Sequence, residues 1–69
     1  MVEVFKTSVN SKDESVHLLR QLHLHFPACK INFDLEDCDH ILRIEGRDIC
    51  VQTVSEILTT QNFTCEQLY

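Results

Sequence analysis

Sulfur and imidazole side chains are the groups in this chain that could bind a metal ion. No two of its four cysteines are separated by two residues, so the spacings typical of zinc and iron–sulfur sites are missing. The nearest candidate is Cys38 with His40, which flank Asp39 and could be joined by His23 or His25. The alternative cofactor is therefore copper or zinc. As isolated thiols, three cysteines are predicted to be small buried hydrophobes: Cys29, Cys50 and Cys65.

The sequence contains no recognisable motif of catalytic residues. A nucleophile needs a base within hydrogen-bond reach, and no motif brings a cysteine and a histidine together for that purpose. A single glycine does not build a phosphate-binding loop. The carboxylates of Glu36, Asp37 and Asp39 belong to a polar turn that should be solvated, so they do not predict a paired-carboxylate acid–base site. The sequence predicts a protein that is not an enzyme.

Composition and charge limit the classes of partner that this chain is expected to bind. The chain has 6 basic and 11 acidic residues and a net charge of −5, which disfavours nucleic acid as a partner. No apolar stretch reaches the ~20 residues of a membrane-spanning helix. Met1 runs directly into Val2-Glu3-Val4-Phe5, without a basic or apolar leader, so we expect a reducing, cytoplasmic location with no membrane insertion and no disulfides.

A length of 69 residues is enough for one domain, which is predicted to cover residues 1–69. A single core of this size rarely supplies more than ~3–5 kcal/mol. One glycine, one proline and no repeat leave no place for a linker.

The first half of the chain predicts a strand and then a helix. Residues 2–7 alternate, with Val2 and Val4 on one side and Glu3, Phe5 and Thr7 on the other. Ser11 and Glu14 are spaced as a capping box, in which the serine accepts from the Glu14 amide and the glutamate from the Ser11 amide. Pro27 ends the helix. The apolar stripe predicted for this helix is Val16, Leu19, Leu22 and Phe26, with Leu18 alongside.

The second half predicts a hairpin, a helix and a last strand. Residues 29–35 alternate again, and a polar turn at 36–39 leads into a strand at 40–45. Asp48 is predicted to cap a second helix, which ends near Asn62 before a strand at 63–68. The positions expected to face inward are Cys29, Ile31, Phe33, Leu35, Leu42, Ile44, Val51, Val54, Ile57, Leu58, Phe63 and Cys65.

This order predicts an α+β fold, a ferredoxin-like βαββαβ sandwich with two helices on one face of a four-stranded antiparallel sheet in the order 4-1-3-2. The other face stays open, and Phe5 and Ile41 would form an apolar spot on it beside Arg43. We expect these three residues to bind a protein partner or a second copy, although single exposed apolar residues also occur without a partner. The predicted open face holds Glu3, Phe5, Thr7, Ile41, Arg43 and Glu45.

The element order, the length and the register from Val4 to Glu14 resemble the heavy-metal-associated domain of copper chaperones and metal-pumping ATPases over nearly the whole chain. That family holds a soft ion with a Met-x-Cys-x-x-Cys loop. Val9 stands here at the methionine position, and Ser11 and Glu14 stand at the two cysteine positions. Hydroxyl and carboxylate oxygens are hard donors, so no metal is expected at Ser11 and Glu14.

Three functions follow as hypotheses. The first is a small non-enzymatic interaction or regulatory module, resembling a heavy-metal-associated domain with a degenerate metal-binding loop. The second is soft-metal binding or trafficking, of copper or zinc, through the relocated Cys38 and His40 site. The third is an enzyme or ligand binder whose cleft forms only on dimerisation.

Overall fold

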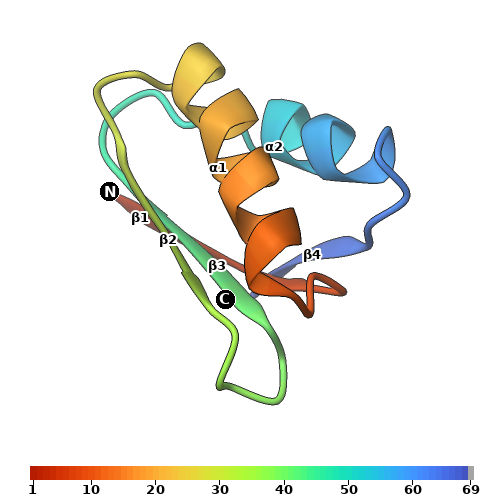
Figure 1. Ribbon diagram of the computed structural model, residues 1–69. Helices are drawn as coiled ribbons and strands as arrows, with labels where there is room; N and C mark the ends of the chain where they lie inside the picture. The colour runs from red at the N-terminus through yellow and green to blue at the C-terminus, as the bar shows by residue number, and fades with distance from the viewer. Residues whose placement is uncertain (69) are drawn as a thin grey trace.

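The chain forms six elements in the order strand, helix, strand, strand, helix, strand, as seen in the computed structural model (Figure 1). The structure describes residues 1–68, and Tyr69, the end of the predicted domain, lies outside the described residues. The elements are β1 (Val2–Thr7), α1 (Lys12–His25), β2 (Lys30–Asp34), β3 (Ile41–Glu45), α2 (Val51–Thr59) and β4 (Cys65–Leu68).

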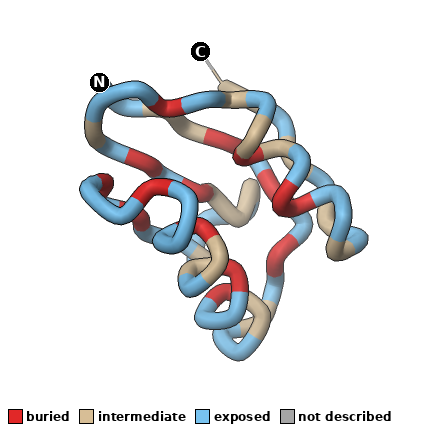
Figure 2. The backbone as a smooth tube through the Cα atoms, turned by 90° about the horizontal axis from the view of Figure 1, so that it is seen from above, coloured by how far each residue is buried: buried red, intermediate tan, exposed pale blue. Residues whose placement is uncertain are grey.

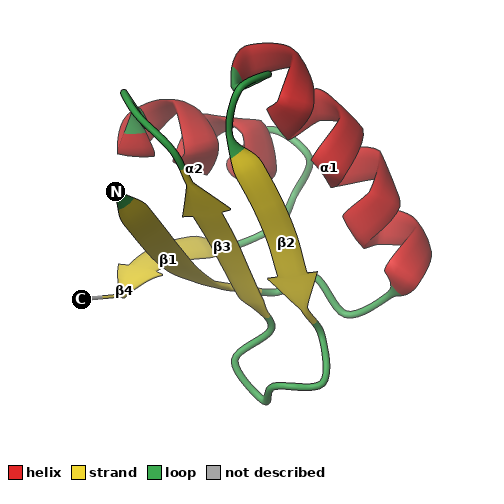
Figure 3. Ribbon diagram, turned by 90° about the vertical axis from the view of Figure 1, so that its left-hand side faces the viewer, coloured by secondary structure: helices red, strands yellow, loops and turns green. Residues whose placement is uncertain are grey.

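The four strands make one antiparallel sheet in the order β2-β3-β1-β4. Both helices cover the same face of this sheet, and no helix of residues 1–68 covers the opposite face (Figure 3). The predicted ferredoxin-like α+β fold, with its strand order, is confirmed. Neither helix within residues 1–68 combines the length and the apolar character needed to cross a membrane.

The core lies between the sheet and the helices. In β1 and in β3, two buried positions are separated by one exposed position (Figure 2). Leu42 and Ile44 of β3 are fully buried, as are Leu18 and Leu22 of α1. Ile31 is buried as well, so the inward faces predicted for β2 and β3 are confirmed.

The faces predicted for β1 are wrong. Phe5 is only 1% exposed and Thr7 is also buried, so both lie under the helices and not on the open face. The reason is the pairing register, because Phe5 stands opposite Leu42 of β3 and cross-strand neighbours share a face. Glu3 shares the face of Phe5 by alternation, and it accepts a hydrogen bond from Gln67 of β4.

One of the two hydrogen bonds predicted for the capping box at the start of α1 is present. The Ser11 hydroxyl accepts a hydrogen bond from the Glu14 amide at 3.2 Å, and Ser11 is the N-cap. The Glu14 carboxylate does not accept from the Ser11 amide as expected. It accepts instead from the amide of Asn10 at 3.4 Å, one residue earlier.

The buried stripe of α1 is rotated from the predicted one. Val16 is 38% exposed and Leu19 is only partly buried. Ser15 takes the core position, where its hydroxyl donates to the Lys12 carbonyl at 2.7 Å and so stays satisfied while buried. Ser15, whose hydroxyl has a local acceptor, is therefore buried in the stripe in place of the larger Val16.

The second helix has a different start from the predicted one and the predicted end. Asp48 does not cap it, since Asp48 lies in the left-handed region at φ 55 and Cys50 is the N-cap. At the other end Asn62 takes φ 68, the Asn62 amide donates to Thr59 and the Phe63 amide donates to Leu58. This pair of bonds is a Schellman motif, which closes α2 where Asn62 was expected to close it.

Candidate functional site

The open sheet face is built from alternate residues of all four strands. On β1 these residues are Val2, Val4 and Lys6, because Phe5 and Thr7 face the helices. The register places Val4 opposite Arg43 on β3 and opposite Leu68 on β4. Ile41 and Arg43 therefore lie on the open face as predicted, and Phe5 does not.

Among residues 1–68, the centre of this face is aliphatic and holds Arg43, which has no ion-pair partner there. Val2 is 44% exposed, and three further aliphatic side chains are half-buried without any helix above them. Arg43 is exposed beside Val4. We call this surface the open-face patch, and its residues are Val2, Val4, Ile41, Arg43 and Leu68.

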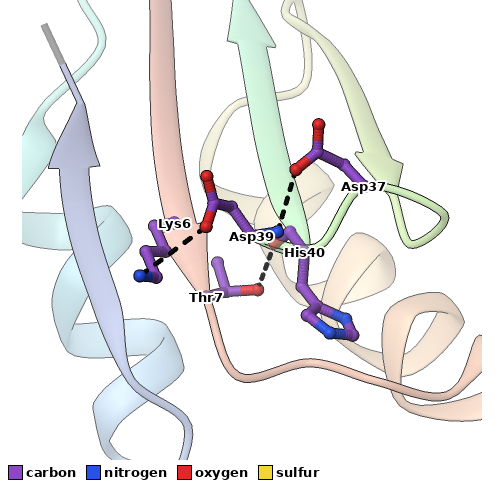
Figure 4. Close-up of polar contacts among 5 residues, drawn as sticks. All are labelled: Lys6, Thr7, Asp37, Asp39 and His40. Carbon is purple, nitrogen blue, oxygen red and sulfur yellow. Dashed lines mark hydrogen bonds and ion pairs between the residues drawn. The ribbon is translucent and has the colours of Figure 1, made fainter.

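One ion pair lies at the border of the open-face patch. Lys6, which stands opposite Ile41, has its ammonium group 3.6 Å from the Asp39 carboxylate (Figure 4). Both side chains are about half exposed, so this pair contributes little to stability. Its effect is to neutralise Lys6 and leave Arg43 as the cation at the centre of the face.

Sequence reasoning missed the three β1 and β4 members of the patch, namely Val2, Val4 and Leu68. Alternation shows which residues share a side but not which side meets the helices. A usable signal was present in the size of Phe5, because a central strand of a small domain tends to bury its aromatic residue in the core. If the side of β1 that carries Phe5 faces the core, Val4 must face the open side of the sheet.

The β2–β3 turn gathers the ligand atoms of three residues that the sequence marked. Oxygen and sulfur atoms of Asp37, Cys38 and Asp39 lie within 4.8 Å of one another. The carboxylates already have partners: Asp37 accepts from the Asp39 amide at 2.8 Å, and Asp34 accepts from the amides of Glu36 and Asp37. These are the side-chain to backbone bonds of an Asx-type turn, which explain the acidic residues without an ion.

His40 does not join that group of ligand atoms. Its ring points away from the carboxylates of Asp37 and Asp39 (Figure 4). Its backbone takes φ 47, and its carbonyl accepts from the buried Thr7 hydroxyl at 2.6 Å. The predicted Cys38 and His40 pairing therefore gains no support from the direction of the imidazole.

The two helix histidines are also not brought to the hairpin. The carboxyl end of α1, which holds His23 and His25, lies at the opposite end of the molecule from the β2–β3 turn (Figures 1 and 3). The ring of His25 instead contacts the Gln21 carbonyl of its own helix at 3.2 Å. The expectation that His23 or His25 completes a site with Cys38 is wrong.

The loop between β1 and α1 is packed as a helix start. Val9, which the expected resemblance would place at a methionine position, is fully buried. The oxygens of Ser11 and Glu14 are both engaged by backbone amides, those of Glu14 and Asn10 respectively. These side chains satisfy the free amides of the first turn, which is a structural task.

The four cysteines are all free thiols with different surroundings. Cys29 is buried, as predicted, whereas Cys65 is only half-buried. Cys50, which was also predicted to be buried, is exposed at the start of α2. Hydrogen bonding from Thr53 lowers the pKa of the Cys50 thiol. Burial raises the pKa of the Cys65 thiol to about 11.

These pKa values predict an order of thiol reactivity. At pH 8 we expect Cys65 to react with iodoacetamide about tenfold more slowly than Cys50, or slower still, because little of it is thiolate and nucleophilicity recovers only part of the difference. Mass spectrometry of the labelled peptides measures both rates, and labelling in urea supplies the unfolded control. Equal native rates would contradict the burial of Cys65.

Comparisons with protein-family models, with curated proteins and with solved structures find no match for this chain. The geometry of residues 1–68 is thus the basis for a functional assignment. No pocket is present within that part of the chain. The surface features available to a partner are the open face, the helix surfaces and the two sheet edges.

Proposed function

We propose that this domain is a non-enzymatic interaction or regulatory module that binds a protein partner through the open-face patch. In plan it resembles a heavy-metal-associated domain whose first loop holds a helix cap where relatives hold an ion. The observation that carries the proposal is the sheet face without a helix above it, on which Val4 lies between Leu68 and the exposed Arg43.

The chemistry of this patch selects a kind of partner. Aliphatic side chains that are already half-buried lose little rotamer freedom on binding and add apolar contact area. Arg43 offers a planar fork of donors that fits a carboxylate, and arginine is over-represented among residues that dominate binding energy. The partner is a protein segment that combines apolar side chains with an aspartate or glutamate.

Site-specific photo-crosslinking tests this proposal. A photo-reactive amino acid at position 41, in the patch, should give one principal protein adduct in an extract. The same group at position 24, which is 81% exposed on α1, should not give that adduct. Unlabelled wild-type domain should compete, whereas Arg43→Glu should compete about tenfold less well or worse.

The matched control is Arg20→Glu, which makes the same charge change on the exposed side of α1 and should compete as the wild type does. Equal competition by Arg43→Glu, or the same adduct from position 24, would contradict the proposal. Native mass spectrometry tests the copper or zinc alternative. One ion retained per chain, and lost in Cys38→Ser or His40→Ala, would replace the interaction role with metal binding.

A further inference from the structure

The edge of the sheet formed by β2 carries a charge pattern that complements itself. Among the described strands, β2 pairs with β3 alone, so one side of its backbone has no strand partner there. Its five residues run Lys30, Ile31, Asn32, Phe33 and Asp34, with opposite charges at the two ends and no proline. Both charged residues are exposed on the open face of the sheet.

Antiparallel pairing of this strand with a second copy, centred on Asn32, would place Lys30 opposite Asp34 twice. The same register would place Ile31 opposite Phe33 on the helix-covered face. Opposite charges and apolar residues that stand directly across from each other both stabilise an antiparallel pair. Centring on Ile31 instead would oppose Lys30 to Asn32 and leave no ion pair within the strand.

Apolar side chains share the flank of α1 above this edge with Lys12 and His23. A hydrogen bond from Gln61 to Gln21 fixes the side of α1 that faces the end of α2. Helical periodicity places Val16, Leu19 and His23 on the opposite side, toward β2, against which α1 packs. Figure 3 shows α1 on the β2 side of the sheet.

Exposed and half-buried apolar groups therefore gather along one border of the domain. Val16 is 38% exposed, and Leu19, Phe33 and Leu35 are only partly buried against the core. A second copy joined at β2 would bring its own α1 beside this helix and cover these side chains. Strand edge and helix flank are thus two parts of one self-complementary surface.

The other edge strand lacks this property. Self-pairing of β4 centred on Glu66 would oppose two glutamates, and centring on Gln67 would oppose Glu66 to Leu68. Like charges directly opposite each other destabilise a pair. The asymmetry favours a closed dimer through β2 over an open chain of copies joined from β2 to β4.

We infer that two copies of this chain associate through antiparallel pairing of their β2 strands, centred on Asn32, and so join two four-stranded sheets into one. This association uses a sheet edge and leaves the open-face patch free. It does not depend on the proposed function.

Sedimentation velocity with a pair of charge variants tests the inference. Wild-type protein at about 0.15 M salt should show a monomer–dimer equilibrium. Lys30→Asp and Asp34→Lys should each weaken the dimer about tenfold or more, because each creates two like-charge pairs. An equimolar mixture of the two variants should dimerise again, since every pair across the seam is then opposite in charge.

The matched control is Glu66→Lys, which makes the same charge change as Asp34→Lys on the other edge strand and should leave the dimer intact. Circular dichroism confirms that each variant is folded. A wild-type monomer at all concentrations up to about 1 mM would overturn the inference. So would chains longer than a dimer, a dimer that survives Lys30→Asp, a dimer lost in Glu66→Lys, or a variant mixture that stays monomeric.

Discussion

Replacing Phe5 with alanine is expected to lower the free energy of unfolding by about 3–5 kcal/mol. The ring is 1% exposed and lies in the core, opposite Leu42 across the β1–β3 pair. The loss equals the ~3–5 kcal/mol that a core of this size supplies, so about half of the variant or more should be unfolded at 25 °C. Urea denaturation followed by circular dichroism measures it.

The neighbouring residue on the opposite face of β1 provides the control. Val4 is half-buried on the open face, so Val4→Ala should cost about 1 kcal/mol or less. If β1 instead had the faces that its alternation first indicates, Val4→Ala would cost more than Phe5→Ala. That reversed order would contradict the assignment of the patch.

Gly46→Ala is expected to lower the free energy of unfolding by about 1–3 kcal/mol, as overpacking does in a filled core. A Cβ at this position would lie 2.6 Å from the Cys29 sulfur and 3.2 Å from its Cβ. The Gly46 amide also donates to the Met1 carbonyl at 2.9 Å, which restrains any movement away from Cys29. Thermal and urea unfolding both measure the loss.

A double-mutant cycle isolates the contact that causes this loss. Cys29→Ala removes the sulfur that the new methyl group would strike, so Gly46→Ala should cost less in that background. The Cβ of residue 29 remains close, and part of the penalty should persist. An unchanged penalty in the Cys29→Ala background would show that the clash with sulfur is not the cause.

Local signals in the sequence predicted the features that depend on near neighbours. Ser11 precedes its helix by the spacing of a cap, and the cap forms because only residues 11 and 14 are involved. The alternation in β2 predicted its faces because Asn32 is polar while Ile31 and Phe33 are apolar. The asymmetry of such a strand leaves one choice of inward side.

Features set by tertiary pairing were not predicted in the same way. Both sides of β1 carry apolar residues, so the side that faces the helices is decided by the register that pairs Phe5 with Leu42. Asp48 has the chemistry of a cap, yet Ile49 is buried and the helix begins only after Cys50. The open-face patch was predicted for its β3 members alone, because its other members lie on strands whose faces depend on pairing.

The hairpin shows why residue types alone mislead about metal sites. Cys38 and His40 are adjacent to Asp39 in sequence, but the left-handed backbone of His40 accompanies a ring that points away from the acidic turn. His23 and His25 lie at the far end of α1. The direction of the His40 ring and the distance of the α1 histidines from the hairpin keep these potential ligands apart, and sequence spacing predicts neither.

An NMR titration of the ¹⁵N-labelled domain with the crosslinked partner segment tests the central claim most directly. Binding at the open-face patch should shift the amides of Val4, Ile41 and Arg43 while those of α1 and the turn at 36–39 stay in place. Shifts confined to the turn or to α1, with the strands of the open face unaffected, would contradict it.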